Sequence, residues 1–190
     1  MPRERTDRRT SLSRTEPAIR YLVVAIVAAM GSLLAQSSVA DEYPVKAAFL
    51  FNFAKFVEWP PLAFKGPEDP IAICVLGQNP FGSALENVVH DKTVANRAFV
   101  VREISNAQQA AKCQIIFVTA LEQKHYRVLL EGLKAQSVLT VGEADDFSAN
   151  GGIINFKLKD ARVRIEIDAN AAQRAGLRIS SKLLSLAERK

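Results

Sequence analysis

An amphipathic pattern covers residues 43–60, with the sequence YPVKAAFLFNFAKFVEWP. At about 100° per residue, its large apolar side chains share one arc about 140° wide. This arc consists of Val45, Phe49, Leu50, Phe53, Phe56 and Val57, whereas Asn52, Lys55 and Glu58 lie on the opposite side. The pattern predicts a helix that Trp59-Pro60-Pro61 closes, because proline lacks the amide N–H and its ring clashes with the preceding turn.

Phe51 breaks this pattern, since it projects among the polar positions near Lys55 and Glu58. Aromatic side chains are usually buried, so one interpretation is that Phe51 packs under the loop after the helix. The other is that Phe51 anchors a protein partner, because exposed aromatic residues often mark interfaces. The sequence leaves both interpretations open.

Apolar runs and helical patterns alternate through the middle of the chain. The expected strands are Ile71–Leu76, 98–102, 114–119 and 137–141, and the expected helices lie between Gly82 and Val89, at 106–112 and at 121–134. Continuous apolar runs such as Ile71–Leu76 are typical of strands buried on both faces. Strands that alternate with helices at these lengths predict an α/β fold with a parallel sheet core.

The last third of the chain shows a different period. Residues 153–159 and 162–168 alternate apolar with polar positions, and only Asp160 and Ala161 separate the two runs. Period two with a short link predicts an antiparallel hairpin with one solvated face. Two helices then close the chain: Ala169–Arg174, which Gly176 ends, and 181–188, which Ser180 caps. We therefore predict a single α/β domain, with a mainly parallel sheet flanked by helices and a C-terminal antiparallel hairpin.

Residues 1–40 have the features of a signal peptide. A basic segment precedes an apolar run at 21–35, and Ser38-Val39-Ala40 offers a small-residue cleavage site. The apolar run is short for a membrane span, which needs about 20 residues. We expect cleavage after Ala40, which leaves a mature periplasmic domain of residues 41–190. The alternative is that the segment stays uncleaved and anchors the protein in the membrane.

The basic charge of the chain lies largely in that segment. Residues 1–40 hold six of the 25 Lys and Arg residues and three of the 20 Asp and Glu residues, which leaves about +2 on the remainder. A nucleic-acid-binding protein would show a concentrated basic face. Because none is visible, we expect no nucleic-acid partner.

Catalytic and metal-binding patterns are missing from the sequence. His90 and His125 have no second ligand at metal-binding spacing, and no G-x-S-x-G motif occurs. Asp145-Asp146 invites a phosphoacceptor interpretation, but the strands that end at Leu76 and Thr119 lack the acids that a Mg²⁺ site needs. We interpret this pair as a solvated turn, and predict no enzyme, no metal and no cofactor.

Cys74 and Cys113 are the only cysteines of the chain. Cys74 lies in the first predicted core strand, and Cys113 directly precedes the strand at 114–119. Two cysteines on neighbouring segments of an exported protein favour a structural disulfide. Two buried free thiols are the alternative.

The carboxyl ends of the predicted parallel strands could bind a small molecule. In open α/β sheets, ligands bind outside these ends, which here supply Gly77, Gln78 and Asn79, then Thr119, then Gly142 and Glu143. A glycine-rich strand–helix turn can also hold an anion on free N–H groups. The same residues make an ordinary tight turn, so the signal is weak.

Several blocks of the sequence resemble the YfiR family of small periplasmic proteins. The first is the 43–60 segment, directly after a signal peptide. The later blocks are Val141-Gly142-Glu143, Phe147, the 151–156 segment GGIINF, 163–168, and the 175–187 segment AGLRISSKLLSLA. The resemblance spans residues 43–187. Some family members carry a second cysteine pair near the Gly-Gly strand, and because this chain has none there, redox sensitivity of such a pair does not transfer.

The resemblance implies a repressor that binds the periplasmic domain of an inner-membrane diguanylate cyclase and thereby lowers cyclic di-GMP and biofilm formation. It also implies possible sequestration by an outer-membrane lipoprotein. We expect the partner surface at Phe51 and at the solvated hairpin face, which comprises Asn155, Lys157, Arg164 and Glu166. The alternatives are a periplasmic small-molecule-binding protein or an accessory subunit of another sensor or transporter, and a homodimer is possible.

Overall fold

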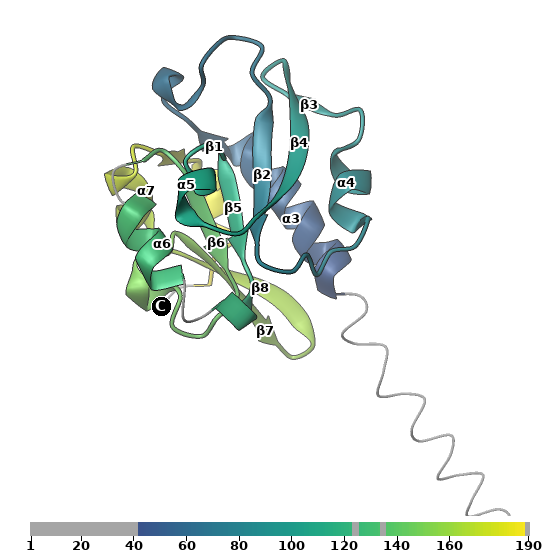
Figure 1. The fold of residues 1–190 in the computed structure, drawn as a ribbon. Coiled ribbons are helices and arrows are strands. Elements are labelled where there is room, and N and C mark those ends of the chain that lie inside the picture. Colours follow the sequence, from purple (N-terminus) through teal and green to yellow (C-terminus); the bar gives the residue numbers. More distant parts are fainter. Residues whose placement is uncertain (1–41, 123–125, 134–135, 189–190) are drawn as a thin grey trace, which may run out of the picture. The chain divides into compact units, whose positions relative to one another are not determined.

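A mixed sheet organises the computed structural model, which describes residues 42–122, 126–133 and 136–188 (Figure 1). In spatial order its strands are β3 (Thr93–Val94), β4 (Arg97–Ile104), β2 (Ile71–Leu76), β5 (Ile115–Val118), β6 (Leu139–Gly142), β7 (Ile154–Lys159) and β8 (Arg162–Ile167). The helices are α3 (Glu42–Phe56), α4 (Ala84–Val89), α5 (Ala107–Ala110), α6 (Tyr126–Leu133), α7 (Ala169–Arg174) and α8 (Ser181–Leu184). Short 3₁₀ turns lie at Pro61–Ala63, Ala120–Glu122 and Ser148–Asn150.

The centre of the sheet is parallel, from β4 through β2, β5 and β6 to β7. β8 returns antiparallel to β7, and both residues of the link, Asp160 and Ala161, have positive φ. Positive φ at both positions of a two-residue link is the conformation that matches the twist of a hairpin. The predicted α/β fold, with its parallel core and C-terminal hairpin, is confirmed.

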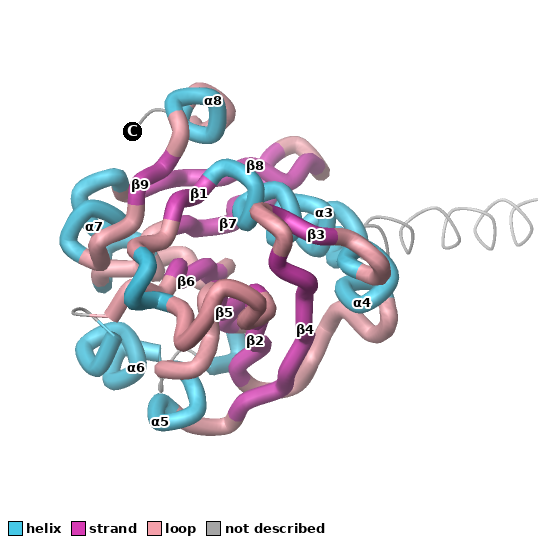
Figure 2. Tube along the Cα trace, turned by 90° about the horizontal axis from the view of Figure 1, so that it is seen from above, coloured by secondary structure: helices cyan, strands magenta, loops and turns pink. Residues whose placement is uncertain are grey.

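Two apolar clusters cover the two faces of this sheet. In the first, α3, α4, α7 and α8 pack on side chains such as Phe117 and Phe156. In the second, α5 and α6 pack on the opposite face around Ile116 and Phe147. All residues of β2, β5 and β6 are buried, as expected for strands covered on both faces. Figure 2 shows the helices on both sides of the strands.

The burial of α3 differs from the wheel. Val45, predicted on the apolar face, is 44% exposed, whereas Lys46 is buried. The buried stripe runs through Ala47, Leu50, Phe53 and Ala54, so it is rotated relative to the predicted arc. Lys46 lies at the start of this stripe, where its ammonium group forms ion pairs with the carboxylates of Glu42 and Glu143.

Short elements at the ends of the predicted helices were missed. The first helix ends at Phe56, and Val57–Glu58 forms β1, which pairs antiparallel with β9 (Arg178–Ile179). The last helix ends at Leu184 rather than 188, and the segment predicted at 121–134 contains a 3₁₀ turn followed by the shorter α6. The Oγ atom of Ser180 caps α8 by accepting a hydrogen bond from Leu183 N, as predicted.

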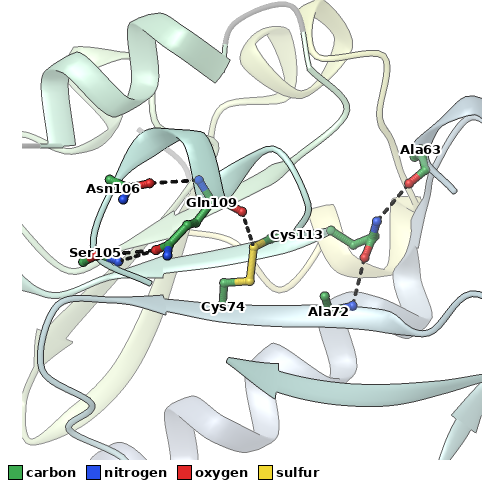
Figure 3. The surroundings of a disulfide bond; sticks show 8 residues. Ala63, Ala72, Cys74, Ser105, Asn106, Gln109 and Cys113 are labelled. Atoms are coloured by element: carbon green, nitrogen blue, oxygen red, sulfur yellow. Dashed lines mark hydrogen bonds between the residues drawn. A yellow bond between two sulfur atoms is a disulfide. The ribbon is translucent and has the colours of Figure 1, made fainter. Parts of the chain in front are cut away.

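The predicted disulfide is present. Cys74 and Cys113 are bonded across 39 residues, with their Cα atoms 6.0 Å apart (Figure 3). The bridge joins β2 to the segment between α5 and β5. It therefore fixes α5 against the sheet.

Among the described residues, no helix combines the length and apolar character needed to cross a bilayer. The predicted signal peptide, residues 1–40, and His125 lie outside the described residues.

Candidate functional site

Lys46 is a buried lysine at the carboxyl edge of the sheet, with 3% of its surface exposed. Its Nζ atom lies 2.5 Å from Glu143 Oε2, directly after β6, and also forms an ion pair with Glu42 in the same helix. Glu42 and Lys46 are four residues apart, a spacing that places two side chains on one helix face. A buried ammonium group requires such partners, because an unpaired charge away from water is strongly destabilising.

Glu143 connects three elements of the fold. Its Oε1 atom accepts hydrogen bonds from the backbone N–H of Ala120, after β5, and from the hydroxyl of Tyr43, at 3.1 and 3.4 Å. With the Lys46 contact on Oε2, one carboxylate links α3 to the ends of β5 and β6. Charge-assisted hydrogen bonds of this kind are roughly twice as strong as neutral ones.

Aromatic rings surround the ammonium group of Lys46. Its Nζ atom lies 4.7 Å from the ring centroid of Tyr43 and 5.7 Å from that of Phe156. Burial, followed by the negative charges of Glu143 and Glu42, raises the pKa of Tyr43 to about 12. The phenol therefore remains protonated at physiological pH and can donate its hydrogen bond.

Two surface hollows share Tyr43 and Glu143. The first hollow, of about 350 Å³, extends over Lys46 and Lys157 to Leu158. The second hollow, of about 260 Å³, extends over Gln78, Asn79 and Thr119 to Leu121. In the second hollow, the amides of Gln78 and Asn79 lie with Thr119 and Glu143, a set of polar groups that can orient a small polar molecule.

The predicted ligand loops meet only in part. Gln78, Asn79 and Thr119 line the second hollow together. Gly77 and Gly142, predicted in the same loops, line neither hollow. A Cβ atom at Gly77 would meet the Glu122 side chain, and one at Gly142 would lie 2.4 Å from the Phe147 ring, so both glycines permit close packing.

The predicted partner residues do not form one surface. Phe51 is half-buried, and its ring packs against Phe99 of β4, with centroids 5.5 Å apart. The hairpin forms the opposite edge of the same sheet, since four strands separate β4 from β8. Its polar face is opposite the α3 side, where Phe156 packs. Phe51 and the hairpin residues therefore cannot contact one partner as a continuous patch.

Asn155 corrects the prediction of a solvated hairpin face. It is fully buried, and its Nδ2 atom donates to the carbonyl of Ala144 at 2.8 Å. The loop after β6 covers this end of β7, so that only the farther part of the face reaches solvent. There, Lys157 contacts Asp145, Arg164 lies 3.8 Å from Glu188, and Glu166 is half-buried.

The two residues of the Asp145-Asp146 pair differ in exposure, since Asp146 is only partly exposed. Asp145 is exposed, but Asp146 Oδ1 accepts a hydrogen bond of 2.5 Å from the hydroxyl of buried Tyr126. Asp146 Oδ2 accepts further bonds from Arg127 and Asn150. The hydrogen bond from Tyr126 is the main cause that lowers the pKa of Asp146. Asp146 thus ties the 142–150 loop to α6.

Sequence reasoning missed Lys46, Tyr43 and Glu42. A signal for Lys46 was available, because it precedes Leu50 by four residues and Phe53 by seven and so falls on the apolar face. A lysine on such a face indicates a buried ion pair. Its main partner, Glu143, is 97 residues away, and no local pattern identifies a partner at that distance.

No group of three or more His, Cys, Asp or Glu side chains within the described ranges is arranged to hold a metal ion.

Comparison with protein families gives one match that covers almost the whole described chain. The family model described as YfiR/HmsC-like matches residues 43–188. This range includes α3 from Tyr43 onward, all the strands of the described residues, and Lys46 and Glu143.

Proposed function

Because the chain belongs to the YfiR/HmsC-like family, we propose that it is a periplasmic regulatory protein that represses an inner-membrane diguanylate cyclase. It binds the periplasmic domain of the cyclase, and so lowers cyclic di-GMP and biofilm formation. The family match over residues 43–188 carries this proposal, since it includes nearly every described element. Export through a cleaved signal peptide at residues 1–40 is part of the same proposal.

Repression by binding is a shift between two conformations of the cyclase. A regulator that binds the inactive conformation more tightly increases its population, and each tenfold preference corresponds to about 1.4 kcal/mol. An outer-membrane lipoprotein that sequesters the regulator would reverse the shift by mass action. This mechanism requires a recognition surface and no catalytic group.

We place the cyclase contact on the outer part of the hairpin. Lys157 and Arg164 are cross-strand partners in β7 and β8, and Glu166 lies two residues farther along β8. β8 is the last strand of the sheet, and its outer edge is contacted by Glu188, whose N–H donates to the Ile165 carbonyl, so that a partner would meet the side chains of the polar face. Mixed charges at such an edge favour specificity through electrostatic complementarity.

Calorimetric titration tests the proposal. Residues 41–190, kept oxidised, are titrated with the periplasmic domain of a diguanylate cyclase encoded in the same operon. Saturable binding at about micromolar affinity or tighter is expected for a specific regulatory complex. Absence of heat and of co-elution, with the domain shown to be folded, would contradict the proposal.

Small-molecule binding is a second candidate function. It is supported by the second hollow, where Gln78, Asn79 and Thr119 meet Tyr43 and Glu143. Native mass spectrometry of the purified protein would reveal a retained ligand as an added mass. The added mass should disappear in a Gln78→Leu/Thr119→Val variant, and a spectrum of unmodified protein alone would count against this function.

A further inference from the structure

A groove of about 540 Å³ lies at the amino end of β2, away from the Lys46 edge. The loop at residues 60–70 forms one wall, and the segment from Ala111 to Gln114 forms the other. Ala72 lies at the floor, and Arg102 of β4 borders the open side. The family-derived proposal does not use this groove.

Arg97 fixes the loop wall. Its Nη1 atom donates to the carbonyls of Gly66 and Asp69, at 2.9 and 2.6 Å. Its guanidinium group also lies 3.7 Å from the centroid of the Phe64 ring. Two hydrogen bonds and a stacked ring thus anchor the loop to Arg97 of β4.

Gln114 and the disulfide fix the other wall. The Nε2 atom of Gln114 donates to the Ala63 carbonyl, and its Oε1 atom accepts from the Ala72 N–H, both at 2.9 Å (Figure 3). Next to it, Cys113 is bonded to Cys74. A groove whose two walls are cross-linked costs little ordering entropy when a partner binds.

The groove is basic, and its cations are available. Lys65, Arg102 and Lys112 are exposed, and none of them forms an ion pair with a carboxylate of the described chain. Asp69 is the acidic group in the lining, and its Oδ2 atom already accepts hydrogen bonds from the N–H groups of Lys65 and Gly66. The lining therefore carries three cations and one carboxylate, so that the groove has a net positive charge.

An apolar element adjoins these cations. Leu62, on the loop wall, is 97% exposed, and the half-buried Phe64 ring lies on the same loop. A fully exposed leucine beside unpaired cations suits a ligand that is both acidic and apolar.

We propose that this groove binds an extended acidic segment of a protein partner. Carboxylates of the segment pair with Lys65, Arg102 and Lys112, and one of its apolar side chains packs on Leu62. An extended segment fits because the three cations are spread along the groove, with Lys65 on the loop wall, Arg102 on β4 and Lys112 before β5. Binding of this acidic segment does not depend on whether the protein also binds a diguanylate cyclase.

Selection from a random 12-residue peptide library on residues 41–190 tests this proposal. The enriched peptide is then synthesised with a fluorophore and its affinity measured by anisotropy. Asp- and Glu-rich sequences with an apolar residue are expected. The Arg102→Glu/Lys112→Glu variant should bind at least about tenfold more weakly, because like charges then face each other.

Two further variants keep the test decisive. Arg162→Glu/Arg174→Glu makes the same charge change on exposed residues of β8 and α7, and should alter affinity less than about twofold. Leu62→Gln removes the apolar contact without adding charge, and because this side chain is almost fully exposed, a loss of peptide binding is not expected to come from unfolding. Enrichment of non-acidic peptides, or equal losses in both charge variants, would overturn the proposal. So would Leu62-dependent binding to phosphatidylglycerol vesicles without any peptide enrichment, which would assign the groove to a lipid surface.

Discussion

The ammonium group of Lys46 and the carboxylate of Glu143 form an ion pair across 97 residues of sequence. The two side chains are 4% and 10% exposed, so neither can regain full hydration if the other is removed. The pair ties the first helix to the end of a central strand. At the carboxyl edge of the sheet, Glu42, Lys46, Glu143 and Tyr43 are thus joined by ion pairs and hydrogen bonds.

Lys46→Met should lower the free energy of unfolding by about 3 kcal/mol, because Glu143 and Glu42 would remain unpaired in a largely buried site. Adding Glu143→Leu should recover part of the loss, since it removes one of the orphaned charges. Urea denaturation of the two single variants and the double variant gives the coupling. The control is Lys55→Met on the exposed part of the same helix, where a change below about 1 kcal/mol is expected. Equal losses for Lys46 and Lys55 would contradict the assigned role.

The hydroxyl of Tyr43 should lose its proton only at strongly alkaline pH, and the free energy of unfolding should fall in that range. Its pKa of about 12 in the folded state exceeds the ordinary value of 10.0, so its contribution is complete below about pH 10 and is lost as the pH rises toward 12. Tyr43→Phe should therefore show a shallower loss of stability across this range. Residues 41–190 contain only Tyr43 and Tyr126, so near-ultraviolet phenolate absorbance resolves their titration. Equal pH slopes in both proteins would refute this assignment.

Replacement of Gly142 and of Gly132 by alanine should change the stability of the fold in opposite directions. A Cβ atom at Gly142 would lie 2.4 Å from the buried Phe147 ring, so Gly142→Ala should destabilise the fold by about 1–3 kcal/mol. Gly132 lies in α6 with open space around its Cβ position, so Gly132→Ala should stabilise by up to about 1 kcal/mol. Thermal melts of the two variants are sufficient, and a stabilising Gly142→Ala would show that Phe147 can move away.

The main strands and helices were predictable because hydrophobic periodicity and residue composition are properties of a short stretch of sequence. Ile71–Leu76 was predicted with the bounds that β2 has, and Ala169–Arg174 with those of α7. The β1–β9 pair was not predictable in this way. Each of its strands has two residues, too few to show a period, and the paired residues Val57 and Ile179 are 122 positions apart in the sequence.

The candidate site depended on contacts that a local pattern does not contain. Asn155 alternates correctly with Ile154 and Phe156, and yet it is buried because the loop at Ala144, 11 residues earlier, folds over it. Alternation identifies the face of a strand but not what covers that face. Gln78, Asn79 and Thr119 were located correctly at one edge because strand ends in a parallel sheet converge by topology.

Loss of the Cys74–Cys113 bridge should lower stability by about 3–4 kcal/mol, because the closed loop spans 39 residues and the reduced unfolded chain gains entropy. Urea denaturation of the Cys74→Ala/Cys113→Ala variant, compared with the oxidised protein, measures the effect. Reductant should shift the parent protein and leave the variant unchanged. A parent protein that is insensitive to reductant would contradict a structural role for the bond.

Substitutions in the hairpin and in α3 should show which of the two elements contacts the cyclase domain. Arg164→Glu and Glu166→Arg change charges on the last strand of the sheet, and each should weaken cyclase-domain binding by about tenfold if this edge is the interface. Phe51→Ala should instead reduce stability, because its ring packs on Phe99, and leave affinity within about twofold. Glu86→Arg is the matched control, since Glu86 is exposed on α4 in the helical layer opposite the polar hairpin face. If Phe51→Ala lowered affinity while the hairpin variants bound normally, the contact would lie on α3, and the hairpin assignment would be wrong.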